Sequence, residues 1–284
     1  MSGRPVGKLL AVTLLLAPLS TGAGAPRQSA GPQRIVSICM QGDQLLLELV
    51  PRERIAALSA LAADPDTSAH WQEARGIPTT HSGAEELVRL KPDLVLVSPS
   101  SALLTVSILK RLGVPVLELG IPLNFDELRD QIRLAGRSFC EEARAEEIVK
   151  SMDARLERLK ARRPPAGKRP TALFCYQDRF TPGAHTFPDA ILEAAGFRNL
   201  AAALGFGAGG SASLETIIMA RPDYLILTQF REASPTLNQL SAAQPVFRKL
   251  GAETKVISVS LNYLVSPDPS NLELAEMLQD QICK

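Results

Sequence analysis

Residues 84–97 read AEELVRLKPDLVLV and residues 214–227 read LETIIMARPDYLIL. Each stretch contains a glutamate, a short apolar-rich segment, a basic residue, Pro-Asp and a run of apolar residues. The proline follows the glutamate by seven residues in both copies. This pattern predicts a short helix followed by a strand that is buried on both faces. The chain therefore repeats one helix–strand unit in two lobes, and a cleft between two lobes is a common place for a ligand.

Strand-like and helix-like segments alternate on both sides of a long helical region. In the first half we expect strands at 34–38, 54–58, 94–97 and 114–117, and helices at 44–50, 85–90 and 101–112. In the second half we expect strands at 171–176, 224–227 and 255–259, and helices at 188–195 and 271–282. This alternation predicts an α/β protein with two Rossmann-like lobes whose sheets are mostly parallel.

One long α-helix is expected to join the lobes. Within the charged segment 139–163, Ile148, Met152, Leu156 and Leu159 recur at helical spacing and form one apolar stripe. Two prolines at 164 and 165 end this pattern. We therefore expect an N-terminal lobe at 33–137, a linking helix at 138–165 and a C-terminal lobe at 168–284.

The N-terminal segment has the pattern of a secretory signal. Arg4 and Lys8 precede an apolar stretch from Leu9 to Leu19, and small residues follow up to Ala25. The apolar stretch is too short to span a bilayer as a mature helix. A basic start, a short apolar region and a small-residue exit predict a cleavable signal peptide at 1–25 and a periplasmic protein.

The composition argues against nucleic acid as a partner and leaves the pairing of the cysteines undecided. The formal net charge is +1 and no basic stripe indicates nucleic-acid binding. The four cysteines are widely spaced without a CxxC pair, which argues against a zinc knuckle. An exported chain can form disulfides, and four cysteines allow three pairings, none of which the sequence favours.

Four phrases occur in a characteristic order around the helical region. They are Arg34-Ile35-Val36-Ser37, the two Glu-x5-basic-Pro-Asp units, and the run Ala-Ala-Gly-Phe-Arg-Asn-Leu at 194–200. In this order they resemble the periplasmic substrate-binding proteins of cobalamin and iron–siderophore ABC importers, over residues 33–284. The resemblance implies a bilobal, non-catalytic protein without a cofactor that captures a bulky metal chelate, a corrinoid or a ferric siderophore. It also implies an ABC permease with its ATPase as partner, and we expect the protein to be a monomer.

The resemblance assigns Glu85 and Glu215 to docking on arginines of the permease, one glutamate from each lobe. Helix capping is the alternative for both residues. Ser82-x-x-Glu85 has the form of a capping box, and Ser213 precedes Glu215 closely.

Candidate ligand contacts follow from the rule that ligands of open α/β sheets lie beyond the carboxyl ends of the strands. The first strands of the two lobes end alike, in Cys39-Met40-Gln41 and Cys175-Tyr176-Gln177. Further candidates come from other strand ends and from the single tryptophan. The ligand-binding set is Met40, Gln41, Trp71, Ser100, Tyr176, Gln177, Gln229 and Tyr263.

Other classes of protein fit the sequence less well. A hydrolase is disfavoured because GxSxG and HExxH motifs do not occur. The GxGxxG match at 205–210 lacks a preceding strand, and we therefore expect a loop rather than a dinucleotide site. Haem or a free metal ion as ligand, and a sensor or interaction module with the same fold, stay open as alternatives.

Overall fold

The computed structural model describes residues 31–101, 103–176, 179–229 and 254–283. The predicted signal segment at 1–25 lies outside these residues. The first sheet has five parallel strands in the order β3-β2-β1-β4-β5. Its strands are β1 Ile35–Ser37, β2 Ile55–Ser59, β3 Thr79–Thr80, β4 Leu94–Val97 and β5 Val116–Glu118. The accompanying helices are α1 Met40–Leu49, α2 Trp71–Ala74, α3 Ala84–Arg89 and α4 Leu103–Arg111.

The second sheet has four parallel strands in the order β11-β10-β6-β8. Its strands are β6 Thr171–Cys175, β8 Arg198–Asn199, β10 Tyr224–Gln229 and β11 Lys255–Ser260. A two-stranded antiparallel ribbon adds β7 Phe180–Thr181 and β9 Gly210–Ser211. The helices of this part are α7 Phe187–Ala195, α8 Leu200–Ala203, α9 Leu214–Ala220 and α12 Asn271–Ile282. The predicted α/β class with two mostly parallel sheets is confirmed. Residues 205–209 form the expected loop, and the last residue of the GxGxxG match, Gly210, begins β9.

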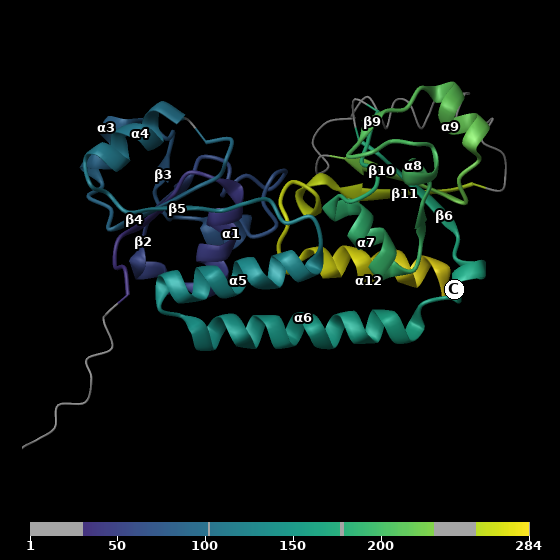
Figure 1. Ribbon diagram of the computed structural model, residues 1–284, viewed down its shortest axis with the longest axis horizontal. Coiled ribbons are helices and arrows are strands. Elements are labelled where there is room, and N and C mark those ends of the chain that lie inside the picture. The colour runs from purple at the N-terminus through teal and green to yellow at the C-terminus, as the bar shows by residue number, and fades with distance from the viewer. Residues whose placement is uncertain (1–30, 102, 177–178, 230–253, 284) are drawn as a thin grey trace, which may run out of the picture. The chain divides into compact units, whose positions relative to one another are not determined.

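The helical region between the sheets is two helices, α5 Phe125–Phe139 and α6 Glu142–Arg162. The linking helix therefore begins later than the expected residue 138. The reason is Cys140, which adopts a left-handed conformation with φ 57° and ends α5. Figure 1 shows α6 running alongside α5 and α12, and residues of α6 contact both of these helices.

The predicted apolar stripe of the linking helix faces the core. Ile148, Met152 and Leu159 are buried, while Leu156 is half-buried against them. The rings of Phe125 and Phe187 meet edge-to-face at 5.0 Å, which joins the first turn of α5 to the first turn of α7. No helix in the described residues is long and apolar enough to cross a bilayer. The four cysteines form no disulfide with one another; Cys39 and Cys175 are buried, and Cys140 and Cys283 are exposed.

The two sequence repeats adopt one structure. In each, a short helix leads through a basic residue with positive φ, 48° at Lys91 and 44° at Arg221, into Pro-Asp and a central strand. The aspartate then accepts hydrogen bonds from the start of the first strand of its own sheet. Asp93 accepts from the N–H groups of Gln33 at 2.5 Å and Arg34 at 2.9 Å. Asp223 accepts from the N–H and the hydroxyl of Thr171, both at 2.7 Å.

These carboxylates fix the register of the central strand pairs. Ile35 pairs with Leu94 in the first sheet, and Ala172 pairs with Tyr224 in the second. Because a carboxylate fixes the amino end of each pair, the carboxyl ends of the two strands come to the same level. Residues that follow these strands are thereby brought side by side.

Replacing either of these aspartates, Asp93 or Asp223, should destabilise the protein. Asp93→Ala and Asp223→Ala should each lower the free energy of unfolding by about 1–3 kcal/mol, because hydrogen bonds to a charged acceptor are lost. The asparagine variants keep one acceptor oxygen and should fall between alanine and wild type. Urea denaturation measures the effect, with Asp130→Ala, an exposed carboxylate on α5, as the control. If the free energy of unfolding of the alanine variants lies within about 0.5 kcal/mol of wild type, these two carboxylates are not needed for stability.

Candidate ligand-binding site

A pocket of about 440 Å³ lies where β1, β2, β3 and β4 end. Its size is within the range of about 300–1,000 Å³ that is usual for small-molecule sites. The strand order of the first sheet reverses direction between β1 and β4, and open α/β sheets bind ligands at such a switch point. We call it the serine pocket. Its lining residues are Ile38, Cys39, Met40, Gln41, Ser59, Ala60, Leu61, Thr80, His81, Ser82, Ser98, Ser100, Ser101 and Val265.

Helix α1 begins at the edge of the serine pocket. Ser37 turns the chain there, because its hydroxyl donates to the carbonyl of Cys39 at 2.9 Å and accepts from the Cys39 N–H at 3.3 Å. Gly42 lets the helix approach the sheet closely, since a Cβ atom there would lie 2.5 Å from the Ser37 hydroxyl. Met40 and the buried Gln41 thus stand in the first turn of α1, against the switch point.

Asp43 lies behind the wall that Ser59 forms. Its carboxylate accepts the Ser59 N–H at 3.0 Å and the Ser59 hydroxyl at 2.5 Å. Burial raises the pKa of Asp43 to about 6, against the lowering effect of these two hydrogen bonds. Asp43 is fully buried, and Ser59 is 8% exposed. The Ser59 hydroxyl therefore donates its proton to the Asp43 carboxylate.

Three hydroxyls gather after β4. The Ser98 hydroxyl lies 3.0 Å from that of Ser100 and 3.2 Å from that of Ser101. The Ser98 N–H also donates to the Ser101 hydroxyl at 2.9 Å. We call these three side chains the serine cluster. It forms a second polar wall, separate from the wall that Ser59 forms.

The end of β3 supplies the third part of the lining. The Thr80 hydroxyl accepts the Ser82 N–H at 3.1 Å, and the Ser82 carbonyl accepts the Thr105 hydroxyl at 3.0 Å. These bonds hold Ser82 in a left-handed conformation with φ 64°. His81 is exposed at this edge, and its N–H donates to Glu86 at 3.1 Å.

The structure brings part of the predicted ligand-binding set together. Met40, Gln41 and Ser100 line the serine pocket. Trp71 opens α2 and is not among the residues that line it. Gln177 lies outside the described residues.

The other three candidates belong to the second sheet. Tyr176 follows β6, where its ring lies 5.9 Å from the ring of Phe180 and burial raises the pKa of its hydroxyl. Gln229 ends β10, and Tyr263 lies in the turn after β11 with its hydroxyl 3.3 Å from Glu273. These three positions stay predictions for a contribution of the second lobe.

Several lining residues were missed by the sequence interpretation. Ser59, Thr80 and Ser82 follow or end β2 and β3, so the strand-end rule that selected Ser100 applies to them too. Nothing in the local sequence indicates that Asp43, on the helix, bonds Ser59. That contact depends on how closely α1 approaches β2.

Glu85 and Glu215 are both exposed, on α3 and α9. The alternative role of Glu85, in a capping box with Ser82, is not found in the structure. Gly83 caps α3 instead, and the glutamate that reaches back is Glu86, because positive φ at Ser82 turns its side chain away from the N-cap position. In α9, Ser213 is the N-cap and accepts the Thr216 N–H at 3.1 Å.

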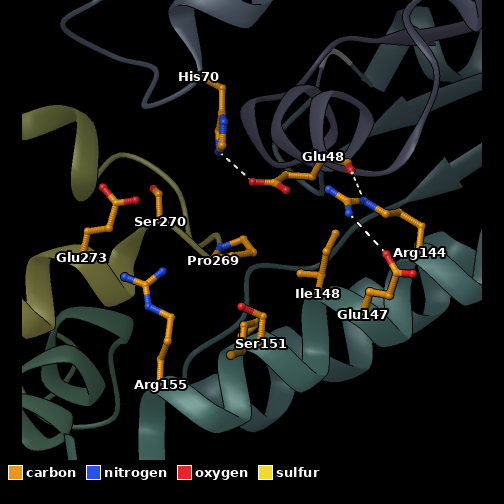
Figure 2. Close-up of a pocket in the computed structure, with 11 residues that line it drawn as sticks. Glu48, His70, Arg144, Glu147, Ile148, Ser151, Arg155, Pro269, Ser270 and Glu273 are labelled. Carbon is orange, nitrogen blue, oxygen red and sulfur yellow. Dashed lines mark hydrogen bonds and ion pairs between the residues drawn. The ribbon is translucent and has the colours of Figure 1, made fainter. Parts of the chain in front are cut away.

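A second pocket, of about 260 Å³, lies against α6 (Figure 2). Its charged groups are paired with one another or with neighbours. His70 lies 3.4 Å from Glu48, and Arg144 lies 3.4 Å from Glu147. Arg155 makes two hydrogen bonds to Glu276, at 2.9 and 2.8 Å. Because these charges are already compensated, the serine pocket is the better candidate for a ligand.

Comparison with known proteins decides the family. The model of the periplasmic binding protein family matches residues 35–257, which include the first sheet, the linking helices and the second sheet up to the first residues of β11. The chain belongs to the periplasmic binding protein family. The serine pocket thus lies at a strand-end switch point of a periplasmic binding protein.

Individual members are distant in sequence and similar in fold. A cobalamin-binding protein of Halobacterium salinarum is 25% identical over 247 residues, which cover 85% of this chain and 67% of that protein. The heme-binding protein RhuT of Roseiflexus sp. RS-1 superimposes with a TM-score of 0.71 at 21% identity, covering 88% of this chain and 97% of that one. An Fe3+-hydroxamate transport protein of Saccharomonospora viridis superimposes with a TM-score of 0.67 at 22% identity, covering 90% and 94%.

Asp43 should make stability depend on pH. With its pKa raised from 3.8 to about 6, the folded protein holds this proton more tightly than the unfolded chain. The stabilisation is complete at acid pH and is lost as pH rises from about 4 to about 6. Its size is about 3 kcal/mol, at about 1.4 kcal/mol for each unit of pKa difference.

Asp43→Asn removes this titration at nearly constant shape. Urea denaturation at several pH values between 4 and 7 should show wild type losing stability with rising pH more steeply than the variant. The pKa of Asp268 is also raised by burial, but this group titrates in both proteins and cancels in the difference. Parallel pH profiles for the two proteins would contradict the assignment.

Proposed function

We propose that this protein is the solute-binding component of an ABC importer, which captures a bulky metal chelate and presents it to a membrane permease. The observation that carries the proposal is the serine pocket, a polar site at the switch point of a periplasmic binding protein. Cobalamin, heme and ferric hydroxamate, after which the three similar proteins above are named, are all metal chelates. Capture and release need no catalytic group, and the protein would act in the periplasm after removal of its signal peptide.

A chelate suits the serine pocket better than a free ion. Serine and threonine hydroxyls dominate the polar lining, and hydroxyls are weak ligands for transition metals, which prefer imidazole, thiolate and carboxylate. The nearby carboxylate of Asp43 already accepts two hydrogen bonds from Ser59. A ligand that brings its own metal-binding atoms needs only polar contacts of the kind this pocket offers.

The repeated glutamates support the permease as partner. Glu85 and Glu215 occupy the same place in two copies of one helix–strand unit, and both are exposed. The pKa of Glu215 is lowered by a backbone N–H, by the Ser213 hydroxyl and by the charge of Arg179, so the residue is ionised. Carboxylate–arginine pairs across an interface are strong and geometrically specific. The sensor alternative would use the same pocket without this pair of contacts.

Ligand capture is tested by thermal shift and calorimetry against cyanocobalamin, haem and several ferric siderophores. A specific ligand binds only the folded state and should raise the free energy of unfolding by about 2.7 kcal/mol at 100 times its dissociation constant. At least one metal chelate should bind at micromolar concentration or below. If every chelate fails while an ester or peptide is turned over, the protein is not a transport component.

Docking is tested by the double variant Glu85→Lys plus Glu215→Lys. We expect uptake and permease binding to be lost, while ligand affinity and melting temperature stay close to wild type. The matched control is Glu53→Lys plus Glu157→Lys, which makes the same charge change at exposed positions outside α3 and α9. Equal uptake by the two double variants would remove Glu85 and Glu215 from the docking surface.

A further inference from the structure

The serine pocket is polar but carries little charge. Among its lining residues, His81 is the one basic side chain, and none is Lys, Arg, Asp or Glu. The carboxylate that contacts the Ser59 wall, Asp43, is fully buried behind Ser59. An anionic group entering the pocket would lose its hydration, meet no cation from this lining and approach a second negative charge. The pocket therefore favours an uncharged part of a ligand.

The Ser59 wall can only accept hydrogen bonds. A hydroxyl has one proton, and the proton of Ser59 is donated to Asp43 at 2.5 Å. The lone pairs of the Ser59 oxygen are what this side chain can offer to a ligand. A group that meets this wall must bring an N–H or O–H donor.

The serine cluster can donate. Its three hydroxyls have three protons, and the two oxygen–oxygen contacts, at 3.0 and 3.2 Å, use two of them. One proton is left to point away from the cluster. The exposed Ser100 and its neighbours can thus donate to a carbonyl oxygen of a ligand.

We propose that the serine pocket binds an uncharged metal chelate through peripheral carboxamide groups, with Ser59 accepting an amide N–H and the serine cluster donating to an amide carbonyl. The inference rests on the proposed function and specifies its ligand. A carboxamide offers a donor and an acceptor without charge. An ester offers only acceptors, and a carboxylate offers only acceptors together with a charge.

Three corrinoids with the same cobalt ion and ring test whether the pocket prefers carboxamide to ester and to carboxylate groups. The probes are dicyanocobinamide, whose periphery is carboxamide, dicyanocobyrinic acid heptamethyl ester and dicyanocobyrinic acid, whose periphery is carboxylate. Calorimetry on the wild-type protein should give the tightest binding for the amide. We expect affinity for the ester to be lower by about tenfold, and affinity for the acid to be lower still, because each lacks a partner for Ser59.

Two serine variants distinguish the acceptor role of Ser59 from the donor role of the serine cluster. Ser59→Ala removes the acceptor and should bring amide and ester affinities within about threefold of each other. Ser100→Ala, at an exposed position, should weaken amide and ester alike and keep their ratio. Ser138→Ala is the control, because its hydroxyl bonds the Leu134 carbonyl on α5 and should change neither affinity. The Ser100 variant keeps the test decisive if loss of Ser59 disturbs folding around Asp43.

The outcomes distinguish this inference from the proposed function. Equal binding of ester and amide by wild type, tighter binding of the acid, or binding of haem or an anionic siderophore but no corrinoid amide would overturn the inference and leave the transport function standing. A protein that binds no chelate of any class overturns both. An amide preference that disappears in Ser59→Ala and persists in Ser100→Ala supports the inference.

Discussion

The carboxylates of Asp93 and Asp223 set the level at which the central strands of each sheet begin. Each accepts hydrogen bonds from backbone N–H groups of the neighbouring first strand, at 2.5–2.9 Å for Asp93 and 2.7 Å for Asp223. Parallel strands that start together also end together, because they rise equally per residue. In the first sheet this places the Ile38 N–H against the Leu96 carbonyl at 3.0 Å, and the chain that follows β1 lies beside the chain that follows β4. The serine pocket is a consequence of that alignment.

Most of the fold could be predicted from the spacing of apolar residues and from the residues that end helices and strands. The expected strand 94–97 and helix 271–282 coincide with β4 and α12, since Pro-Asp and polar turns mark their limits. Two departures from the sequence expectations have one cause, positive φ at residues other than glycine. Cys140, with φ 57°, divides the helical region into α5 and α6, and Ser82, with φ 64°, moves the cap of α3 to Gly83. Tertiary contacts such as the bond from Thr105 to the Ser82 carbonyl hold these conformations, and no local pattern announces them.

The candidate site was predictable where it depends on topology and unpredictable where it depends on helix–sheet packing. The strand-end rule located Met40, Gln41 and Ser100 because it needs only the ends of strands. The pairing of Asp43 with Ser59 needs α1 to lie close against the sheet, which Gly42 permits by the absence of a Cβ. Trp71 was selected for its residue type rather than for a strand end, and it does not line the pocket. Position in the topology was the better guide.

The repeat also corrects how the two lobes should be compared. The shared strand order is β2-β1-β4-β5 in the first sheet and β8-β6-β10-β11 in the second. Aligning Leu94 with Tyr224 makes Ile35 equivalent to Ala172, and therefore Cys39 equivalent to Tyr176. The resemblance between Cys39-Met40-Gln41 and Cys175-Tyr176-Gln177 is thus displaced by one residue from the structural equivalence. The same alignment places Thr228, a buried residue of β10, at the position of Ser98, which directly follows β4, so both sheets carry a buried hydroxyl side chain at this position. The helix–strand unit repeats the chemistry of its strand end together with its fold.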